Sequence, residues 1–177
     1  MDLLGTLVGD ESLVSTIGAQ AGLDSGKVSS VLEALAPVLG KGLSRNAAAP
    51  GGLENLLGAL SGGNHERYLE DPEALRRPEG IADGNAILGH ILGDKDVSRA
   101  VAGRAAEQTG VGAAIIKQIL PMVAGAAMGA LGRQTRSADI GADRSAAPSA
   151  LAAFLDADQD GSMVDDLLDM ASRFLRR

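Results

Sequence analysis

An acidic heptapeptide near the C-terminus, Asp156 to Ser162, has the residue types and the spacing needed to bind a hard cation. Its sequence is Asp-Ala-Asp-Gln-Asp-Gly-Ser, so carboxylates at alternate positions precede a glycine. An EF-hand loop takes oxygen ligands from positions 1, 3, 5, 7, 9 and 12, and a glycine at position 6 allows its sharp turn. Asp156, Asp158 and Asp160 match positions 1, 3 and 5, Gly161 matches position 6, and Ser162 can supply a backbone carbonyl at position 7. The segment is therefore a candidate Ca²⁺ site.

The segment departs from the EF-hand pattern at position 12, where Leu167 replaces the usual bidentate glutamate. Asp165 or Asp166 can close a shortened loop, so the predicted metal ligands are Asp156, Asp158, Asp160, Ser162 and Asp165, with weak affinity. A second interpretation needs no ion. Carboxylates near a helix N-terminus are favourable by about 0.3–1 kcal/mol each, so these acids can simply cap the last helix. Both interpretations stay open at this point.

The composition predicts an all-α protein. Hydrophobic residues make up 45% of the 177 residues, which is enough to build one sizeable core or two small ones. Ala and Leu favour helices, whereas the aromatic residues that favour strands are nearly absent, with no Trp, one Tyr and two Phe. The 24 glycines then act as helix breaks, caps and points of close contact.

Apolar periodicity predicts two long helices and several short ones. Residues 28–39 and 116–123 each carry an apolar face at helical spacing, but Pro37 and Pro121 fall inside these patterns and predict a kink or a break. We expect Asp83-Gly84-Asn85 to form a turn and Ser98 to cap a helix. The shorter helices are expected at about 2–9, 10–21, 52–61, 85–93, 97–109, 148–156 and 162–175.

The two long helices belong to a weak internal duplication. Gln20, Gly22 and Val28 fall opposite Gln108, Gly110 and Ile116, and the register continues downstream. The predicted architecture is thus a multi-helix array of two related units plus a C-terminal hairpin with the acidic loop. Two charged, proline-containing stretches separate the parts. The predicted divisions are an N-terminal helical unit at 1–61, a polar linker at 62–84, a second helical unit at 85–132, a flexible linker at 133–148 and the acidic loop with its amphipathic helix at 149–177.

The stretch from Asp83 to Gly93, which contains Ile-Leu-Gly-His-Ile-Leu-Gly, resembles the YidB-like family of bacterial proteins of unknown function. Lys95 to Val101, Gln108-Thr-Gly and Ile119-Leu-Pro-Met extend the resemblance over most of the chain. It implies an all-α fold, and many members of that family end in a similar acidic segment before a last helix. It implies no activity, so no catalytic residues are carried over.

Other chemistry-bearing residues have structural interpretations. His90 lies among isoleucines and leucines, and the chain has only one other histidine, His65, and no cysteine, so a histidine metal cluster is not expected. The Gly pairs at 89/93 and 125/129 predict close helix packing, with self-association as the alternative. An enzyme using carboxylates such as Asp83 or Glu107 is the third hypothesis, and it lacks a clustered partner base.

These features predict a non-catalytic, soluble protein of the cytoplasm. The net charge of −7 argues against nucleic-acid binding. The apolar run Ile119 to Gly132 is shorter than the roughly 20 residues that cross a bilayer, which predicts no transmembrane segment. Met163, Leu167, Met170, Ala171 and Phe174 form a stripe that either packs on the body or binds a partner. The protein is expected to bind a partner or itself with Ca²⁺ at the acidic loop; alternatively, it is purely structural and binds no metal.

Overall fold

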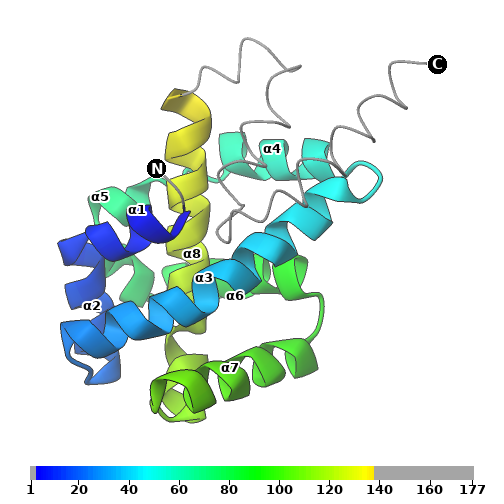
Figure 1. Cartoon of the computed structure of the whole chain (residues 1–177). Helices are drawn as coiled ribbons and strands as arrows, with labels where there is room; N and C mark the ends of the chain where they lie inside the picture. Colours follow the sequence, from blue (N-terminus) through cyan, green and yellow to red (C-terminus); the bar gives the residue numbers. More distant parts are fainter. Residues whose placement is uncertain (1–2, 138–177) are drawn as a thin grey trace.

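The computed structural model describes residues 3–137, and every regular element in that range is a helix (Figure 1). The prediction of an all-α fold is confirmed. The acidic loop, the helices expected at 148–156 and 162–175 and most of the 133–148 linker lie outside the described residues. The elements are α1 (Leu3–Gly9), α2 (Glu11–Ala21), α3 (Ser25–Ala48), α4 (Gly52–Gly62), α5 (Arg67–Glu70), the 3-10 helix η1 (Pro72–Arg76), α6 (Pro78–Leu92), α7 (Lys95–Thr109) and α8 (Ala113–Ser137).

Helix α8 is the centre of the fold. It contacts every other helical element, and Figure 1 shows it passing through the middle of the molecule. All residues of the apolar run Ile119 to Gly132 are buried. A helix that is apolar on all sides needs other elements around its whole circumference, and the remaining helices supply them.

Helix α8 is longer than the apolar run Ile119 to Gly132, whose short length was the reason for expecting no transmembrane segment. By length and composition, Ala113–Arg136 would be able to cross a membrane, and it is the one such helix among the described residues. However, 78% of its most apolar stretch is buried inside the protein, which is the pattern of a core helix. The structure therefore contains no clear transmembrane segment in the range 3–137.

Both prolines lie inside continuous helices, so the predicted breaks are wrong. Helix α3 continues through Pro37, and α8 continues through Pro121. Proline removes one backbone hydrogen bond from a helix. Packing on neighbouring elements can outweigh that loss, and Pro121 is buried against α6, where Gly84 lies beside its carbonyl group.

The two helix pairs of the proposed duplication have the expected local order. Gly22 ends α2 with φ 65° and Gly110 ends α7 with φ 70°, and each is followed by a long helix. Positive φ values favour glycine, which explains the residue at both turns. Many helical hairpins share this order, and the internal repeat is not confirmed.

The segment 62–84 does not behave as an exposed linker. It contains α5, η1 and the first half of α6, and the side chains of Tyr68 and Leu75 are fully buried. Pro78 occupies the first position of α6, where its fixed φ suits a helix start, so this helix begins well before the expected residue 85. The expected turn at Asp83-Gly84-Asn85 is wrong for the same reason, because these residues lie within α6.

Candidate functional site

A partly buried polar network joins α5, α6 and the loop that follows α4. The Tyr68 hydroxyl donates a hydrogen bond to Asp83 Oδ2 at 2.7 Å, and His65 Nδ1 lies 3.1 Å from the same oxygen. Arg67 donates from a guanidinium nitrogen to the Tyr68 hydroxyl at 2.9 Å, and its guanidinium carbon lies 4.8 Å from the centre of the Tyr68 ring. The network therefore links a phenol, an imidazole, a carboxylate and a guanidinium group within a short distance.

Glycines of α8 position this network. Gly129 lies against the His65 carbonyl, so close that an added Cβ would come within 2.7 Å of that oxygen. Gly125 lies against Leu75 and the Tyr68 ring, and a Cβ added to Gly125 would lie 3.6 Å from that ring. Small residues four apart let another backbone approach a helix closely, so α5 and η1 rest directly on α8. The predicted close packing at Gly125 and Gly129 is confirmed.

Burial sets the electrostatics of the network. It raises the pKa of Tyr68 above its ordinary value, and the hydrogen bond to Asp83 raises that pKa further, because both favour the neutral phenol. The pKa of Arg67 is also raised, chiefly by its hydrogen bond to Tyr68. The His65 side chain is 8% exposed and the Asp83 side chain is 28% exposed, so the network extends from the interior to the surface.

The network joins elements that are distant from one another along the chain. A single oxygen, Asp83 Oδ2, faces both Tyr68 and His65. The other ring nitrogen of His65, Nε2, lies directly beside Gly63. The three side chains therefore connect α6 to the segment that packs on α8.

Comparison with known families identifies the chain. The model of a family described as "Bacterial protein of unknown function (DUF937)" matches residues 2–134. The chain belongs to this family. No curated protein and no solved structure matches it. The YidB-like resemblance of the sequence is consistent with this assignment.

The matched region of this DUF937 protein contains the whole polar network and ends before the acidic loop. The predicted Ca²⁺ ligands Asp156, Asp158, Asp160, Ser162 and Asp165 lie outside the described residues. Between residues 3 and 137, the structure contains no group of three or more His, Cys, Asp or Glu side chains that could hold a metal ion.

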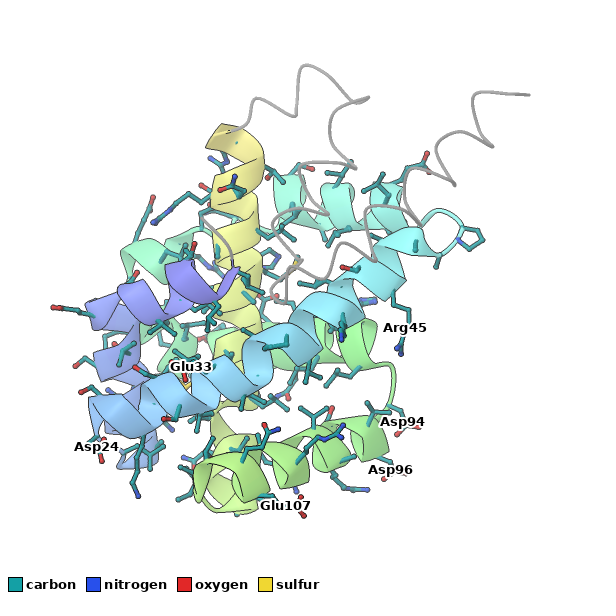
Figure 2. All side chains as sticks on the ribbon, viewed as in Figure 1. Asp24, Glu33, Arg45, Asp94, Asp96 and Glu107 are labelled. Atoms are coloured by element: carbon teal, nitrogen blue, oxygen red, sulfur yellow. The ribbon has the colours of Figure 1, made fainter. Side chains whose placement is uncertain are left out.

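The other residues singled out in the sequence lie apart from one another. Asp83 belongs to the network, whereas Glu107 lies exposed on α7 (Figure 2). His90 is exposed, as its structural interpretation allowed, and its carbonyl accepts a hydrogen bond from Asn46 at 2.8 Å. Ser98 does not cap α7, because Asp94 holds that position. The structure thus keeps these residues from forming a common site.

The second predicted glycine pair has a different role in this DUF937 protein. A Cβ at Gly89 would have no neighbour within 4 Å, and Gly93 ends α6 with φ 76°. The prediction of close helix packing at this pair is therefore wrong, because Gly89 faces open space and Gly93 is a helix cap. Glycine spacing alone does not distinguish these roles.

Sequence reasoning missed the network as a unit. His65 and Tyr68 are three residues apart in a segment that was expected to be an exposed linker. The one available signal was the presence there of the chain's only tyrosine and one of its two histidines. Asp83 is 15 residues further along the chain, and the packing of both α5 and α6 on α8 brings it to Tyr68.

Tyr68 provides a spectroscopic test of the network, because the chain has no other tyrosine and no tryptophan. We expect the Tyr68 phenolate to form above pH ~10, the ordinary range for tyrosine, in the folded protein. A raised folded-state pKa contributes stability that is fully present below the unfolded-state pKa and is lost as pH rises through the folded value. The free energy of unfolding should therefore fall as pH rises above about 10.

Near-ultraviolet absorbance of the phenolate, recorded in native and in urea-unfolded protein, measures this difference directly. The Asp83→Ala variant removes one of the causes of the shift, so its native titration should move toward that of the unfolded chain. Superimposable native and unfolded titrations of the unmodified protein would contradict the burial of the phenol.

Proposed function

We propose that this DUF937 protein is a non-catalytic cytoplasmic module that acts through contacts with a protein partner or with further copies of itself. The observation that carries the non-catalytic part is the mutual pairing in the partly buried network. Tyr68 and His65 both face Asp83 and so join α6 to the segment 65–68, and Arg67 donates to Tyr68 within α5. Such a network rigidifies a core, which is useful in a module that must present a fixed surface.

The second part of the proposed function is a Ca²⁺-type cation at Asp156, Asp158, Asp160, Ser162 and Asp165. It is supported by the alternation of three carboxylates before Gly161. Oxygen ligands in this order suit a hard cation of flexible coordination geometry. The net charge of −7 and the absence of cysteine agree with an acidic, non-nucleic-acid-binding protein of a reducing compartment.

A purely structural role without metal is the alternative, and one feature of the body favours it. Three described helices begin after an aspartate whose side chain accepts a backbone hydrogen bond: Asp10 from Leu13, Asp24 from Lys27 and Asp94 from Asp96. Figure 2 labels Asp24 and Asp94 at the starts of α3 and α7. Because this chain repeatedly uses aspartate as a helix cap, Asp160 before Gly161-Ser162 can serve in the same way.

Calorimetric titration of the full-length protein with calcium tests the cation site. We expect one binding event per chain with a dissociation constant of ~10⁻⁴–10⁻³ M, because the loop lacks the acid at its last position. The double substitution Asp158→Ala plus Asp160→Ala removes two ligands and should abolish the heat of binding.

The matched control is Asp139→Ala plus Asp143→Ala, which changes the net charge equally but leaves the loop intact. Its titration should equal that of the unmodified protein, whereas an equal loss in both variants would indicate binding by general acidity. If the unmodified protein gives no heat with millimolar calcium, the acids act as a cap and the alternative stands.

A further inference from the structure

A groove of about 690 Å³ lies between the end of α1, the outer side of α2 and the first turns of α3. Leu23 and Ser25, which line it, flank Asp24, and Figure 2 labels Asp24 at the α2–α3 corner. This groove is far in sequence from the polar network. No residue of the network lines it.

The groove is lined by apolar and small side chains together with polar ones, among them Glu11, Ser15 and Ser29. Val8, Val14 and Leu23 supply apolar surface, and Gly18 and Ala19 contribute little or no side chain. At Gly18 an added Cβ would come within 2.7 Å of the Leu23 carbonyl oxygen, so the backbone itself forms part of the floor. A depression of this kind fits bulky side chains projecting from another segment.

Aromatic residues are rare in the described body, where Tyr68 is the one Phe, Tyr or Trp. Both phenylalanines of the chain, Phe154 and Phe174, and two of its methionines, Met163 and Met170, come after Ser137. Met163, Leu167, Met170, Ala171 and Phe174 recur at helical spacing. We infer that this apolar stripe, residues 163–174, docks into the α1–α2–α3 groove of its own chain.

The connection is long enough for this contact within one molecule. Residues 138–162 join Ser137 to the stripe, and an extended chain covers ~3.3–3.6 Å per residue. This reach exceeds the diameter of about 40 Å expected for a folded domain of this size. Because the stripe is tethered, its effective concentration at the groove is in the millimolar range, so even weak contacts keep it bound.

Charge at the edge of the groove agrees with this occupant. Glu11 lines the groove and is exposed, and Arg173 precedes Phe174 in the stripe, with Arg176 and Arg177 beyond. An arginine near Glu11 orients the stripe without burying a charge, since an exposed pair of this kind contributes only ~0–1 kcal/mol. The apolar side chains provide the main part of the contact, because their burial scales with area.

This inference goes beyond the proposed function and does not depend on the cation. A partner that uses either the groove or the stripe has to displace the intramolecular contact first. The docked stripe therefore sets a threshold for partner binding, in the manner of an autoinhibitory segment.

Distances between two spin labels test the docking in the full-length protein. The chain contains no cysteine, so the pair Ser12→Cys plus Ser172→Cys carries labels only at the exposed side of α2 and next to the stripe. We expect one short and narrow distance population, both in calcium and in EDTA. A broad distribution of long distances in both buffers would overturn the inference. A pair with Ser61→Cys on α4 in place of Ser12→Cys should give a narrow but longer distance.

Matched arginine substitutions identify the groove as the docking surface. Ala19→Arg fills the groove, whereas Ala100→Arg adds the same side chain on the exposed face of α7. We expect the short distance to be lost in Ala19→Arg and retained in Ala100→Arg. Equal melting temperatures would show that both variants fold. Retention of the short distance in Ala19→Arg would exclude this groove. The doubly labelled protein is also diluted with excess unlabelled protein. Loss of the short distance on this dilution would overturn docking within one chain, because the stripe would then lie in the groove of a second copy.

Discussion

Replacing Gly84 by alanine should destabilise the protein by about 2–3 kcal/mol, because a Cβ at this position collides with the backbone of α8. It would lie on the Pro121 carbonyl oxygen, 2.6 Å from the carbonyl carbon and 2.9 Å from Cα. Backbone atoms in the middle of a buried helix cannot rotate away as the end of a flexible side chain can. Helix α6 would have to move away from the central helix along its whole length.

A second glycine of the same helix provides the control. Gly89 also lies within α6, but a Cβ there would meet nothing within 4 Å. Alanine at 89 should therefore stabilise the protein by roughly 0.5–1 kcal/mol, because glycine costs a helix backbone entropy. The two substitutions are chemically identical and should shift the urea midpoint in opposite directions. Equal shifts of the urea midpoint would show that α6 does not pack closely on Pro121. If Gly84→Ala fails to fold alone, it can be measured in the Gly89→Ala background.

The apolar run in the sequence predicted the centre of the fold well. Residues Ile119 to Gly132 are nearly all apolar or small, and all of them are buried in α8. Such a run gives no preferred face, so it predicts burial on all sides without indicating which elements surround it. The glycines at 125 and 129 predicted a close neighbour, but not that the neighbour would be α5 and η1.

Local rules failed where tertiary contacts outweigh them. Pro78 was interpreted as part of a linker, although proline is well suited to the first turn of a helix and starts α6 here. Pro121 was expected to kink or break a helix, and the break is wrong, because α8 continues through this buried residue. In the segment 62–84, frequent charged residues concealed three apolar anchors, Tyr68, Leu69 and Leu75, because charged residues flank the Tyr68-Leu69 pair and separate it from Leu75. The overall composition of a segment does not reveal single apolar residues that become buried.

The candidate site was predictable only in parts. Asp83 was named as a carboxylate of interest, but its partners could not be identified, because His65 and Tyr68 reach it only after α5 folds onto α8. Nothing local to Asp83 encodes that approach. The predicted Ca²⁺ loop is the opposite case, since the residues proposed as its ligands are close together in sequence and their spacing can be evaluated without a fold.

Truncating Tyr68 to alanine should cost about 3–5 kcal/mol, close to the range for other large buried aromatic residues. Its side chain is fully buried and packs on Gly125 of α8, so its removal leaves a cavity that neighbouring backbone cannot readily fill. It also removes the donor to Asp83 and the acceptor of Arg67. Urea denaturation followed by circular dichroism measures the change, since far-ultraviolet signals do not depend on tyrosine.

Tyr68→Phe separates the two contributions. The ring remains, and only the hydroxyl hydrogen bonds are lost, so the expected cost is about 1–2 kcal/mol. This cost stays moderate because Asp83 is partly exposed and keeps His65, and because Arg67 is exposed to water. In a double-mutant cycle, Tyr68→Phe and Asp83→Ala should be non-additive by about 0.5 kcal/mol or more. Strict additivity would show that the hydrogen bond contributes nothing and that Tyr68 acts only as an apolar ring packed between α5 and α8.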